Sequence, residues 1–247
     1  MYSGLGKIYV VGIGPGNYEN MTIKADTVLK DCDVIIGYGV YVDLVRERYS
    51  DKEFLTTPMT QETLRCRMAI DTARSGRNVS VICSGDSGIY GMAALLYELR
   101  GGDSTPPIEV IPGITAASSG GAVLGAPLTH DFAVISLSDR LTPWEKIENR
   151  LRAAAEADFS IVIYNPRSKG RPDHLKKACE ILLKILPGNR ICGIAENIGR
   201  AGEARWIMTL RELKDADADM FCTVFIGNEM TKDIGGDMVT PRGYKNV

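Results

Sequence analysis

Three cationic side chains occur within one five-residue segment of the chain. Arg167, Lys169 and Arg171 closely follow the apolar run 159–164, which has the composition of a buried strand. Arginine offers paired donors to a carboxylate and lysine offers a compact charge, so this segment is suited to a ligand with several carboxylates. A solubilising role is the alternative interpretation. Because loops carry a large share of functional residues, we favour ligand binding.

A second segment with chemical potential lies at 83–91. It reads Cys-Ser-Gly-Asp-Ser-Gly-Ile-Tyr-Gly and follows the apolar run 79–83. Ligands of open α/β sheets bind beyond the carboxyl ends of the strands, so Asp86 and the backbone around it are candidates for binding a polar small molecule. Asp86 is equally suited to cap a helix expected at 92–99. The sequence leaves both interpretations open.

The glycine-rich segment 12–16, Gly-Ile-Gly-Pro-Gly, follows the first apolar run of the chain. A dinucleotide-binding fingerprint requires Gly-x-Gly-x-x-Gly, but here the third glycine comes one residue early and Pro15 occupies the turn. A dinucleotide-dependent oxidoreductase is therefore disfavoured. The segment is either a structural strand exit or a ligand contact.

Two further segments combine turns with polar or small residues. The segment 111–117 reads Ile-Pro-Gly-Ile-Thr-Ala-Ala, a turn into a helix whose small residues permit close approach. Ser138, Asp139 and Arg140 are polar residues on a predicted loop between a strand and a helix, and helix capping does not explain them. His130 precedes the same strand, where a histidine in a turn is the more common interpretation.

The composition disfavours several classes of protein. The chain has 247 residues, of which 45% are hydrophobic and 24% charged, as in ordinary globular proteins. Its formal net charge of −2 disfavours a nucleic-acid binder, which normally carries a basic excess. No apolar run approaches the roughly 18 residues of a membrane span, and the N-terminus lacks the layout of a secretory signal. We therefore expect a cytoplasmic protein.

Cysteines and histidines are the strongest candidate metal ligands in the chain. The six cysteines show no close pairs, and the only two histidines are His130 and His174. A structural zinc site needs about four such ligands, usually in pairs. The sequence therefore predicts buried reduced thiols and no metal site.

Eight short apolar runs alternate with segments of helical period. Buried strands that alternate with helices predict an α/β fold, and the polar tail after Gly227 predicts a loop. The small-residue segment 114–127 separates two series of strands, so we interpret it as the joint between two α/β domains, 1–118 and 126–247. The predicted strands are 8–12, 33–36, 79–83, 108–111, 132–137, 159–164, 190–195 and 221–227.

Two helices can be placed from the residues at their ends. Thr142, Pro143 and Glu145 have the pattern of a cap, a proline at the first helical position and a capping-box glutamate. Farther on, apolar residues from Leu175 to Leu186 fall on one face of a predicted helix that ends before Pro187 and Gly188.

Taken in chain order, these segments resemble the tetrapyrrole methylase family. The matching elements are the Gly-x-Gly-Pro-Gly loop, Ser-Gly-Asp followed by Ile-Tyr-Gly, Pro-Gly-Ile-Thr-Ala, and a strand ending in Tyr-Asn. The match extends over essentially the whole chain. Many family members have proline after Gly-Asp, where this chain has Ser87.

The resemblance implies two α/β domains with an active-site cleft between them, and a homodimer. It also implies S-adenosylmethionine as the methyl donor, bound without a pyrophosphate cradle. By residue match, the implied cofactor contacts are Pro15, Ser84, Gly85, Asp86, Ile89, Thr115, Ala116, Asn165 and Ala195.

Within the family, four segments resemble the branch that methylates carbon 17 of precorrin-3B, or of its cobalt-containing counterpart cobalt-factor III, in cobalamin biosynthesis. They are 84–93, 130–139, 164–171 and 240–244. Methyl transfer from a sulfonium needs mainly positioning of the nucleophilic carbon. The substrate implied by the resemblance is a tetrapyrrole with acetate and propionate side chains, which we expect to be held by Arg140, Arg167, Lys169 and Arg171.

The resemblance further implies that the macrocycle contracts during the reaction. Contraction requires removal of a proton from a hydroxyl, for which a positioned base is useful. Asp139, His130 and Glu196 are the candidate bases.

Other functions are compatible with the same residues. They include a methylase of the same fold acting on uroporphyrinogen, on a different corrin carbon or on a modified protein histidine. A dinucleotide-dependent oxidoreductase and a non-catalytic ligand-binding protein are more distant alternatives. The sequence does not decide whether the substrate carries cobalt.

Overall fold

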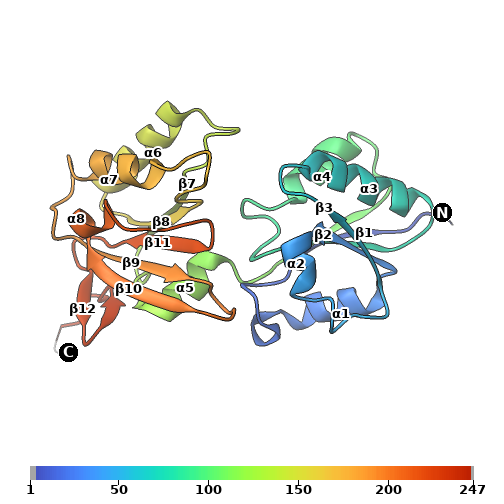
Figure 1. Cartoon of the computed structure of the whole chain (residues 1–247), viewed down its shortest axis with the longest axis horizontal. Coiled ribbons are helices and arrows are strands. Elements are labelled where there is room, and N and C mark those ends of the chain that lie inside the picture. The colour runs from blue at the N-terminus through green and yellow to red at the C-terminus, as the bar shows by residue number, and fades with distance from the viewer. Residues whose placement is uncertain (1–3, 246–247) are drawn as a thin grey trace. The chain divides into compact units, whose positions relative to one another are not determined.

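The computed structural model describes residues 4–245 of the chain. The chain divides into two compact units, Met1–Ala116 and Ala117–Val247, and each has its own five-stranded sheet (Figure 1). The segment interpreted as the joint, 114–127, contains the helix α5 (Ala116–Leu124), which begins at this division.

The sheet of the N-terminal unit is entirely parallel, with the strand order β3-β2-β4-β1-β5. In a parallel sheet the carboxyl ends of neighbouring strands meet at one edge, so the loops that follow β4, β1 and β5 lie side by side. The strands are β1 (Ile8–Gly12), β2 (Val34–Tyr38), β3 (Glu53–Thr57), β4 (Val79–Cys83) and β5 (Ile108–Ile111).

Helices cover both faces of this sheet, because successive side chains of each strand point to opposite sides. Val11 packs with α1 (Ile23–Asp31) and α2 (Gly39–Asp43) on one face, and a short 3-10 helix, Tyr18–Asn20, precedes α1. Val10 packs with α3 (Glu62–Arg74) and α4 (Ala93–Arg100) on the other face. Both valines are fully buried, which explains the uninterrupted apolar runs in the sequence.

The sheet of the C-terminal unit is mixed, with the strand order β10-β9-β11-β8-β7. The strands β7 and β8 pair in parallel, and the other neighbours are antiparallel. The carboxyl ends of β7 and β8 therefore lie together. The strands are β7 (Phe132–Ser136), β8 (Ser160–Tyr164), β9 (Ile191–Glu196), β10 (Ala204–Thr209) and β11 (Cys222–Ile226).

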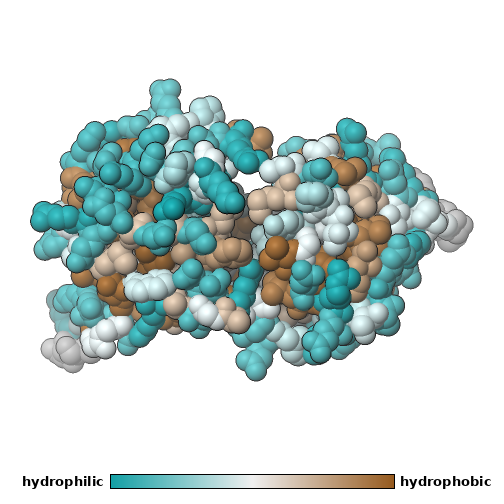
Figure 2. Space-filling model, viewed as in Figure 1, coloured by the Kyte–Doolittle hydropathy of each residue, from teal (hydrophilic) through white to brown (hydrophobic). Residues whose placement is uncertain are grey.

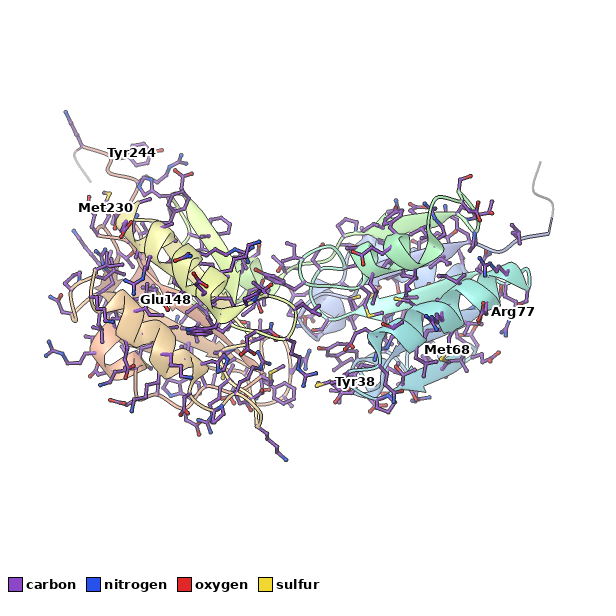
Figure 3. The ribbon with its side chains drawn as sticks, turned by 90° about the horizontal axis from the view of Figure 1, so that it is seen from above. Tyr38, Met68, Arg77, Glu148, Met230 and Tyr244 are labelled. Atoms are coloured by element: carbon purple, nitrogen blue, oxygen red, sulfur yellow. The ribbon has the colours of Figure 1, made fainter. Side chains whose placement is uncertain are left out.

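Helices α6 (Trp144–Glu156), α7 (His174–Leu182) and α8 (Leu210–Leu213) pack against this sheet in one hydrophobic core. The helix α5 packs closely at Gly120, where an added Cβ would lie 3.0 Å from the ring of Phe225 in β11. Glu148 of α6, labelled in Figure 3, forms an ion pair of 2.6 Å with Arg152 one turn later.

The eight predicted strands are confirmed, with shifts of at most two residues at their ends. The strands β3 and β10 were not predicted because both are edge strands whose side chains are largely half-buried or exposed, so neither gives an uninterrupted apolar run. Trp206 in β10, for example, is 45% exposed.

The prediction of a loop after Gly227 is wrong. The tail contains β12 (Lys232–Ile234) and β13 (Asp237–Val239), which form a small sheet with β6 (Gly125–Ala126). Strands of two or three residues form through backbone pairing and leave little pattern in the side chains. The buried Thr240 secures the tail, because its hydroxyl donates to Pro127 O at 2.7 Å.

The predicted start of α6 at Thr142 is also wrong. Pro143 is the N-cap, with φ −54° and ψ 141°, and no side chain caps the helix. The extended ψ places Pro143 outside the helix, although its carbonyl already accepts the N–H of Lys146 at 3.0 Å. The helix predicted as far as Leu186 ends at Leu182, and turns continue the chain beyond it.

Figure 2 shows that hydrophilic residues cover most of the visible surface of both units, with hydrophobic residues exposed in places, including near α2, where Val40 is 38% exposed. Among residues 4–245, no helix combines the length and apolar character needed to cross a membrane.

Candidate functional site

The three loops that follow β1, β4 and β5 are joined to one another by hydrogen bonds, between backbone atoms for the first two and through side chains for the third. Gly14 and Gly85 exchange two such bonds, of 3.1 and 2.7 Å, and the N–H of Ile13 donates to Cys83 O at 2.9 Å. The loop after β1 is therefore fixed to the loop after β4. Gly14 and Gly85 have φ of +76° and +69°, which glycine adopts without steric cost.

The glycines at these strand ends are explained by close packing of backbone on backbone. A Cβ on Gly12 would lie 2.7 Å from Gly85 O, and one on Gly113 would lie 2.2 Å from the same oxygen. Gly12 and Gly113 are therefore required where the three loops meet. This packing gives Gly12 a structural role, and contact of the segment 12–16 with a ligand stays a prediction.

Asp86 links the loop after β4 to the loop after β5. One carboxylate oxygen accepts the N–H groups of Gly88 and Ile89, at 2.7 and 3.1 Å, and the other accepts the N–H of Gly113 at 2.9 Å. Asp86 does not cap α4, since the N–H of Ala93 donates to Ser87 O at 3.1 Å. The Asp86 carboxylate therefore fixes the shape of the loops after β4 and β5.

Ser87, which stands where many family members have proline, is fully buried. Its hydroxyl donates to Ile111 O, at the end of β5, at 3.0 Å. Ser87 therefore supplies a second link between the loops that Asp86 joins, and it defines the backbone path that the sequence left undetermined.

The predicted cofactor residues of the N-terminal unit all lie on these three loops. Pro15 follows β1, while Ser84, Gly85, Asp86 and Ile89 follow β4. A Cβ on Gly85 would lie 3.7 Å from Thr115 Cα and 3.8 Å from Ala116 N, so both residues after β5 adjoin it. Ile89 is 42% exposed. The structure thus brings the seven predicted residues of this unit, Pro15, Ser84, Gly85, Asp86, Ile89, Thr115 and Ala116, to one edge of the sheet.

In the C-terminal unit, Asn165 lies directly after β8 in a left-handed conformation, with φ +53°. Its side-chain amide donates to Ser136 Oγ, at the end of β7, at 2.9 Å. The neighbouring Tyr164 hydroxyl accepts the N–H of Ala117 at 2.7 Å. Ala195, the other predicted contact in this unit, is fully buried in β9 between β10 and β11.

The four predicted substrate-binding cations have different environments. Arg140 and Lys169 are exposed, whereas Arg167 forms an ion pair with Asp217. Arg171 is only 8% exposed, and its Nε donates to Ser168 Oγ at 3.2 Å. The structure therefore does not present the four cations as one exposed group.

The three candidate bases lie apart in the C-terminal unit. His130 precedes β7 and its Nε2 lies 3.0 Å from the carbonyl oxygen of Pro241, while Asp139 lies beyond the other end of β7. Glu196 ends β9 and belongs to a group with Asp219 and Cys222 whose side-chain ligand atoms all lie within 4.8 Å of one another. Asp219 already accepts the N–H of Phe221 at 2.7 Å.

The side chain that sequence reasoning missed is His174, the first residue of α7. Its Nε2 lies 3.0 Å from Oδ2 of Asp139, and its ring packs edge-on against Trp144 at 4.9 Å between ring centroids. The hydrogen bond from His174 is the largest contribution that lowers the pKa of Asp139, and the charge of Arg171 acts in the same direction. The only signal in the sequence was a histidine at a helix start shortly after the cationic loop.

All six cysteines are buried and free, which confirms the prediction of buried reduced thiols. Burial raises the pKa of the Cys66, Cys179 and Cys222 thiols to about 12, so these groups stay protonated at neutral pH.

The sequence pattern that defines the tetrapyrrole (corrin/porphyrin) methylases matches residues 7–214, and the chain belongs to this family. A protein of Salmonella typhimurium described as a probable cobalt-factor III C(17)-methyltransferase is 44% identical over 236 residues, covering 95% of this chain and 98% of the relative. A precorrin-3B C(17)-methyltransferase of Sinorhizobium is 38% identical over 248 residues, covering 97% of each chain. The crystal structure of the methyltransferase CobJ matches with a TM-score of 0.89 at 37% identity, covering 96% of this chain and 100% of that one.

Proposed function

We propose that this chain transfers the methyl group of S-adenosylmethionine to carbon 17 of cobalt-factor III, with contraction of the ring, in cobalamin biosynthesis. The observation that carries the proposal is the 44% identity to a probable cobalt-factor III C(17)-methyltransferase over nearly the full length of both chains. Identity to the precorrin-3B enzyme is lower, at 38%, which favours the cobalt-containing substrate.

The family uses S-adenosylmethionine, and the loops of the N-terminal unit fit such a ligand. Gly85 lies next to Thr115, since an added Cβ on Gly85 would lie 3.7 Å from Thr115 Cα, so the loops after β4 and β5 offer backbone to one ligand together. The exposed side chain of Ile89 offers apolar surface on the same loop. When bound, the cofactor supplies an electrophilic methyl group on a sulfonium.

We assign the cofactor contacts to the two groups of residues named by the family resemblance. In the N-terminal unit these are the residues of the three joined loops, for which Asp86 and Ser87 act as the framework. In the C-terminal unit they are Asn165, whose amide is oriented by Ser136, and the backbone at Ala195. Because loops held by several hydrogen bonds need little reordering, this framework favours fixed positioning of the reactants, an effect worth up to about 7–11 kcal/mol of barrier.

We assign recognition of the substrate carboxylates to Arg140, Arg167 and Lys169. Arg140 and Lys169 are exposed. Arg167, near the start of the loop after β8, forms an ion pair with Asp217. Arg171 is too buried to meet a macrocycle directly. The homodimer implied by the family resemblance and the cytoplasmic location expected from the sequence remain predictions.

Single-turnover methyl transfer tests the proposal. The protein is mixed with methyl-labelled S-adenosylmethionine and, in parallel reactions, with cobalt-factor III, precorrin-3B or uroporphyrinogen. We expect label in cobalt-factor III, with a change of absorbance that reports contraction. Label in uroporphyrinogen alone would assign the chain to another branch of the family, and absence of label from all three would contradict the proposal.

A further inference from the structure

The loop between β7 and α6 carries an apolar side chain that is almost fully exposed. Leu141 is 98% exposed, more than any other large apolar side chain among residues 4–245, and its neighbour Arg140 is also exposed. We propose that Leu141 packs on the apolar face of the tetrapyrrole substrate, and that Asp139 and His174 are positioning residues that hold the loop in place for it. This inference rests on the proposed function and adds a residue that recognises the ring itself.

Exposure of one apolar side chain does not by itself mark a binding site, because single exposed leucines are common on protein surfaces. The loop that carries Leu141 is distinctive because it is fixed on both sides of its tip, residues 140–142. Before the tip, the N–H of Leu137 donates to Tyr164 O at 2.9 Å. After the tip, Pro143 is the N-cap of α6, with φ −54°. Leu141 therefore lies on an anchored loop, which Figure 1 shows extending away from the sheet between β7 and α6.

The ring of His174 contacts the loop on both sides of this tip. Because a carboxylate accepts but does not donate, Nε2 of His174 donates to Oδ2 of Asp139, directly before the tip, at 3.0 Å. The same ring packs edge-on against Trp144, two residues after the tip, at 4.9 Å between ring centroids. His174 is 9% exposed, whereas the side chain of Asp139 is 36% exposed. His174 thus anchors the loop from inside the unit.

The charges around Asp139 strengthen this anchor. The hydrogen bond from His174 is the largest contribution that lowers the pKa of Asp139, and the charge of Arg171 acts in the same direction. A lowered pKa keeps the carboxylate ionised at neutral pH, and an ionised acceptor forms a stronger hydrogen bond than a neutral one. The contacts of Asp139 therefore suit a residue that fixes a loop.

The tip belongs to the same edge of the sheet as the proposed ligand contacts of this unit. The strands β7 and β8 are parallel, so the loops that follow them leave the sheet together. Asn165, directly after β8, is hydrogen-bonded to Ser136 at the end of β7. Lys169 is exposed on the loop after β8. Leu141 therefore lies on one of the two neighbouring loops to which we assign contacts with the cofactor and with the substrate carboxylates.

The side chains of the tip match two parts of a tetrapyrrole. The macrocycle is flat, with largely apolar faces and with carboxylates around its rim. Leu141 can cover part of one face while the adjacent Arg140 meets a carboxylate of the rim, and binding sites for small molecules combine such apolar surface with a few polar groups. Because the loop is already anchored, it loses little conformational freedom when the substrate binds.

Absorbance titration with cobalt-factor III tests the role of Leu141. We expect Leu141→Ala to bind about 10-fold more weakly, since apolar surface covered by the ring is lost, and Leu141→Met to stay close to the parent. Affinity for S-adenosylhomocysteine and urea unfolding should not change, because Leu141 is 98% exposed. Ile234→Ala, at a side chain of β12 that is 51% exposed, is the matched control.

Parental affinity in Leu141→Ala would overturn the inference and leave the proposed function standing. A parent protein that binds no tetrapyrrole would refute the proposed function, and the inference with it. Sedimentation of the same variants tests contact with a second copy of the chain. Altered self-association in Leu141→Ala with unchanged affinity for cobalt-factor III would assign Leu141 to that contact and overturn the inference.

Salt separates the apolar contact from the ionic one. A contact between Arg140 and a carboxylate weakens at about 1 M salt, where charges are screened within about 3 Å, whereas apolar packing persists. The affinity ratio between the parent and Leu141→Ala should therefore be the same at low and high salt, while the ratio for Arg140→Ala falls. If the ratio for Leu141→Ala falls to one at high salt, the side chain does not pack on the ring.

Trypsin cleavage after Arg140 tests the anchoring of the loop without substrate or catalysis. Asp139→Ala loses the acceptor for His174, whereas the amide oxygen of Asp139→Asn can still accept, and both variants lack the charge next to the cleavage site. We expect cleavage about 10-fold faster in Asp139→Ala than in Asp139→Asn, the effect of one hydrogen bond. Cleavage after Lys184, an exposed position beyond α7, is the internal control.

Substitutions at His174 leave the sequence around the cleavage site unchanged. Because the glutamine amide can donate in place of Nε2, His174→Gln should be cleaved more slowly than His174→Leu. Equal cleavage rates within each pair of variants would overturn the positioning role. If His174→Leu does not fold, the pair at the exposed Asp139 decides the role.

Discussion

The carboxylate of Asp86 accepts the backbone N–H of Gly113 at 2.9 Å, although 27 positions separate the two residues in the chain. This hydrogen bond joins the carboxyl ends of two strands, β4 and β5, which are not neighbours, because β1 lies between them. Together with the bonds to Gly88 and Ile89, this hydrogen bond lets the Asp86 carboxylate hold the proposed cofactor loops in shape, alongside the bond from Ser87 to Ile111.

We predict that Asp86→Ala lowers the unfolding free energy by about 1–3 kcal/mol, since three backbone N–H groups lose their acceptor. The variant should also bind S-adenosylhomocysteine at least about 10-fold more weakly, because the loops lose their fixed shape. Urea unfolding and calorimetric titration measure the two effects. Asp103→Ala, an exposed position before β5, is the control and should match the parent. Unchanged cofactor affinity in Asp86→Ala would show that the loops keep their shape without this carboxylate.

We predict that Gly113→Ala destabilises the N-terminal unit by about 1–3 kcal/mol, because a Cβ there would lie 2.2 Å from Gly85 O and 2.6 Å from Gly12 O. Backbone atoms form this contact, so no side chain can rotate to relieve it. Gly102→Ala, where no atom lies within 4 Å of an added Cβ, is the matched control and should be neutral or slightly stabilising. Thermal unfolding distinguishes the two. Equal melting temperatures for the two variants would contradict the close approach of the three loops.

The features of this site that the sequence predicts are those set by residues close together in the chain. The strands were predictable because each is a continuous apolar run between two layers of helices. The location of the candidate residues was then predictable as well, since the loops that follow parallel strands lie at the same edge of the sheet. The reason why position 12 must be glycine was not predictable, because the residues that pack against it, Gly85 and Gly113, lie on loops far away in the sequence.

The same limit explains why His174 was missed. Its apolar neighbours in the sequence identify a helix face, but its hydrogen-bond partner Asp139 lies 35 positions earlier. The short strands β12 and β13 were missed for a different reason, since they are stabilised by backbone pairing that is nearly independent of side-chain pattern.

We predict a pH-dependent contribution to stability from Asp26. Burial raises the pKa of its carboxyl, but hydrogen bonds from Lys30, Tyr49 and Arg48 outweigh burial and lower the pKa to about 2. In the unfolded chain the pKa is about 3.9. The stabilisation, about 2 kcal/mol, is therefore present above about pH 4 and is lost as the pH falls toward about 2.

Urea unfolding between pH 7 and pH 2 measures this contribution. Asp26→Asn should be less stable than the parent at pH 7 and should lose less further stability on acidification. Asp71→Asn, at a side chain that is 75% exposed, is the control and should follow the parent curve. If the curves of Asp26→Asn and the parent run parallel over the whole range, the ionised carboxylate does not stabilise the fold.

We predict that Arg140→Ala and Lys169→Ala each weaken tetrapyrrole binding by about 10-fold, because a hydrogen bond to a charged group is worth about 1.5–3 kcal/mol. Affinity for S-adenosylhomocysteine should not change. Absorbance titration with the tetrapyrrole and calorimetry with the cofactor product measure the two affinities. Lys184→Ala, an exposed position after α7, is the charge-matched control. Loss of both affinities together, or of neither, would be inconsistent with carboxylate recognition by these cations.

The position of the transferred methyl group tests the central claim most directly. Carbon-13 methyl-labelled S-adenosylmethionine is reacted with carbon-13-enriched cobalt-factor III, and carbon–carbon coupling in the product spectrum identifies the carbon that receives the label. We predict a single new methyl signal coupled to carbon 17 of a contracted macrocycle. A methyl signal coupled to any other carbon, or no incorporated label, would contradict the assignment of this chain as a C17-methyltransferase.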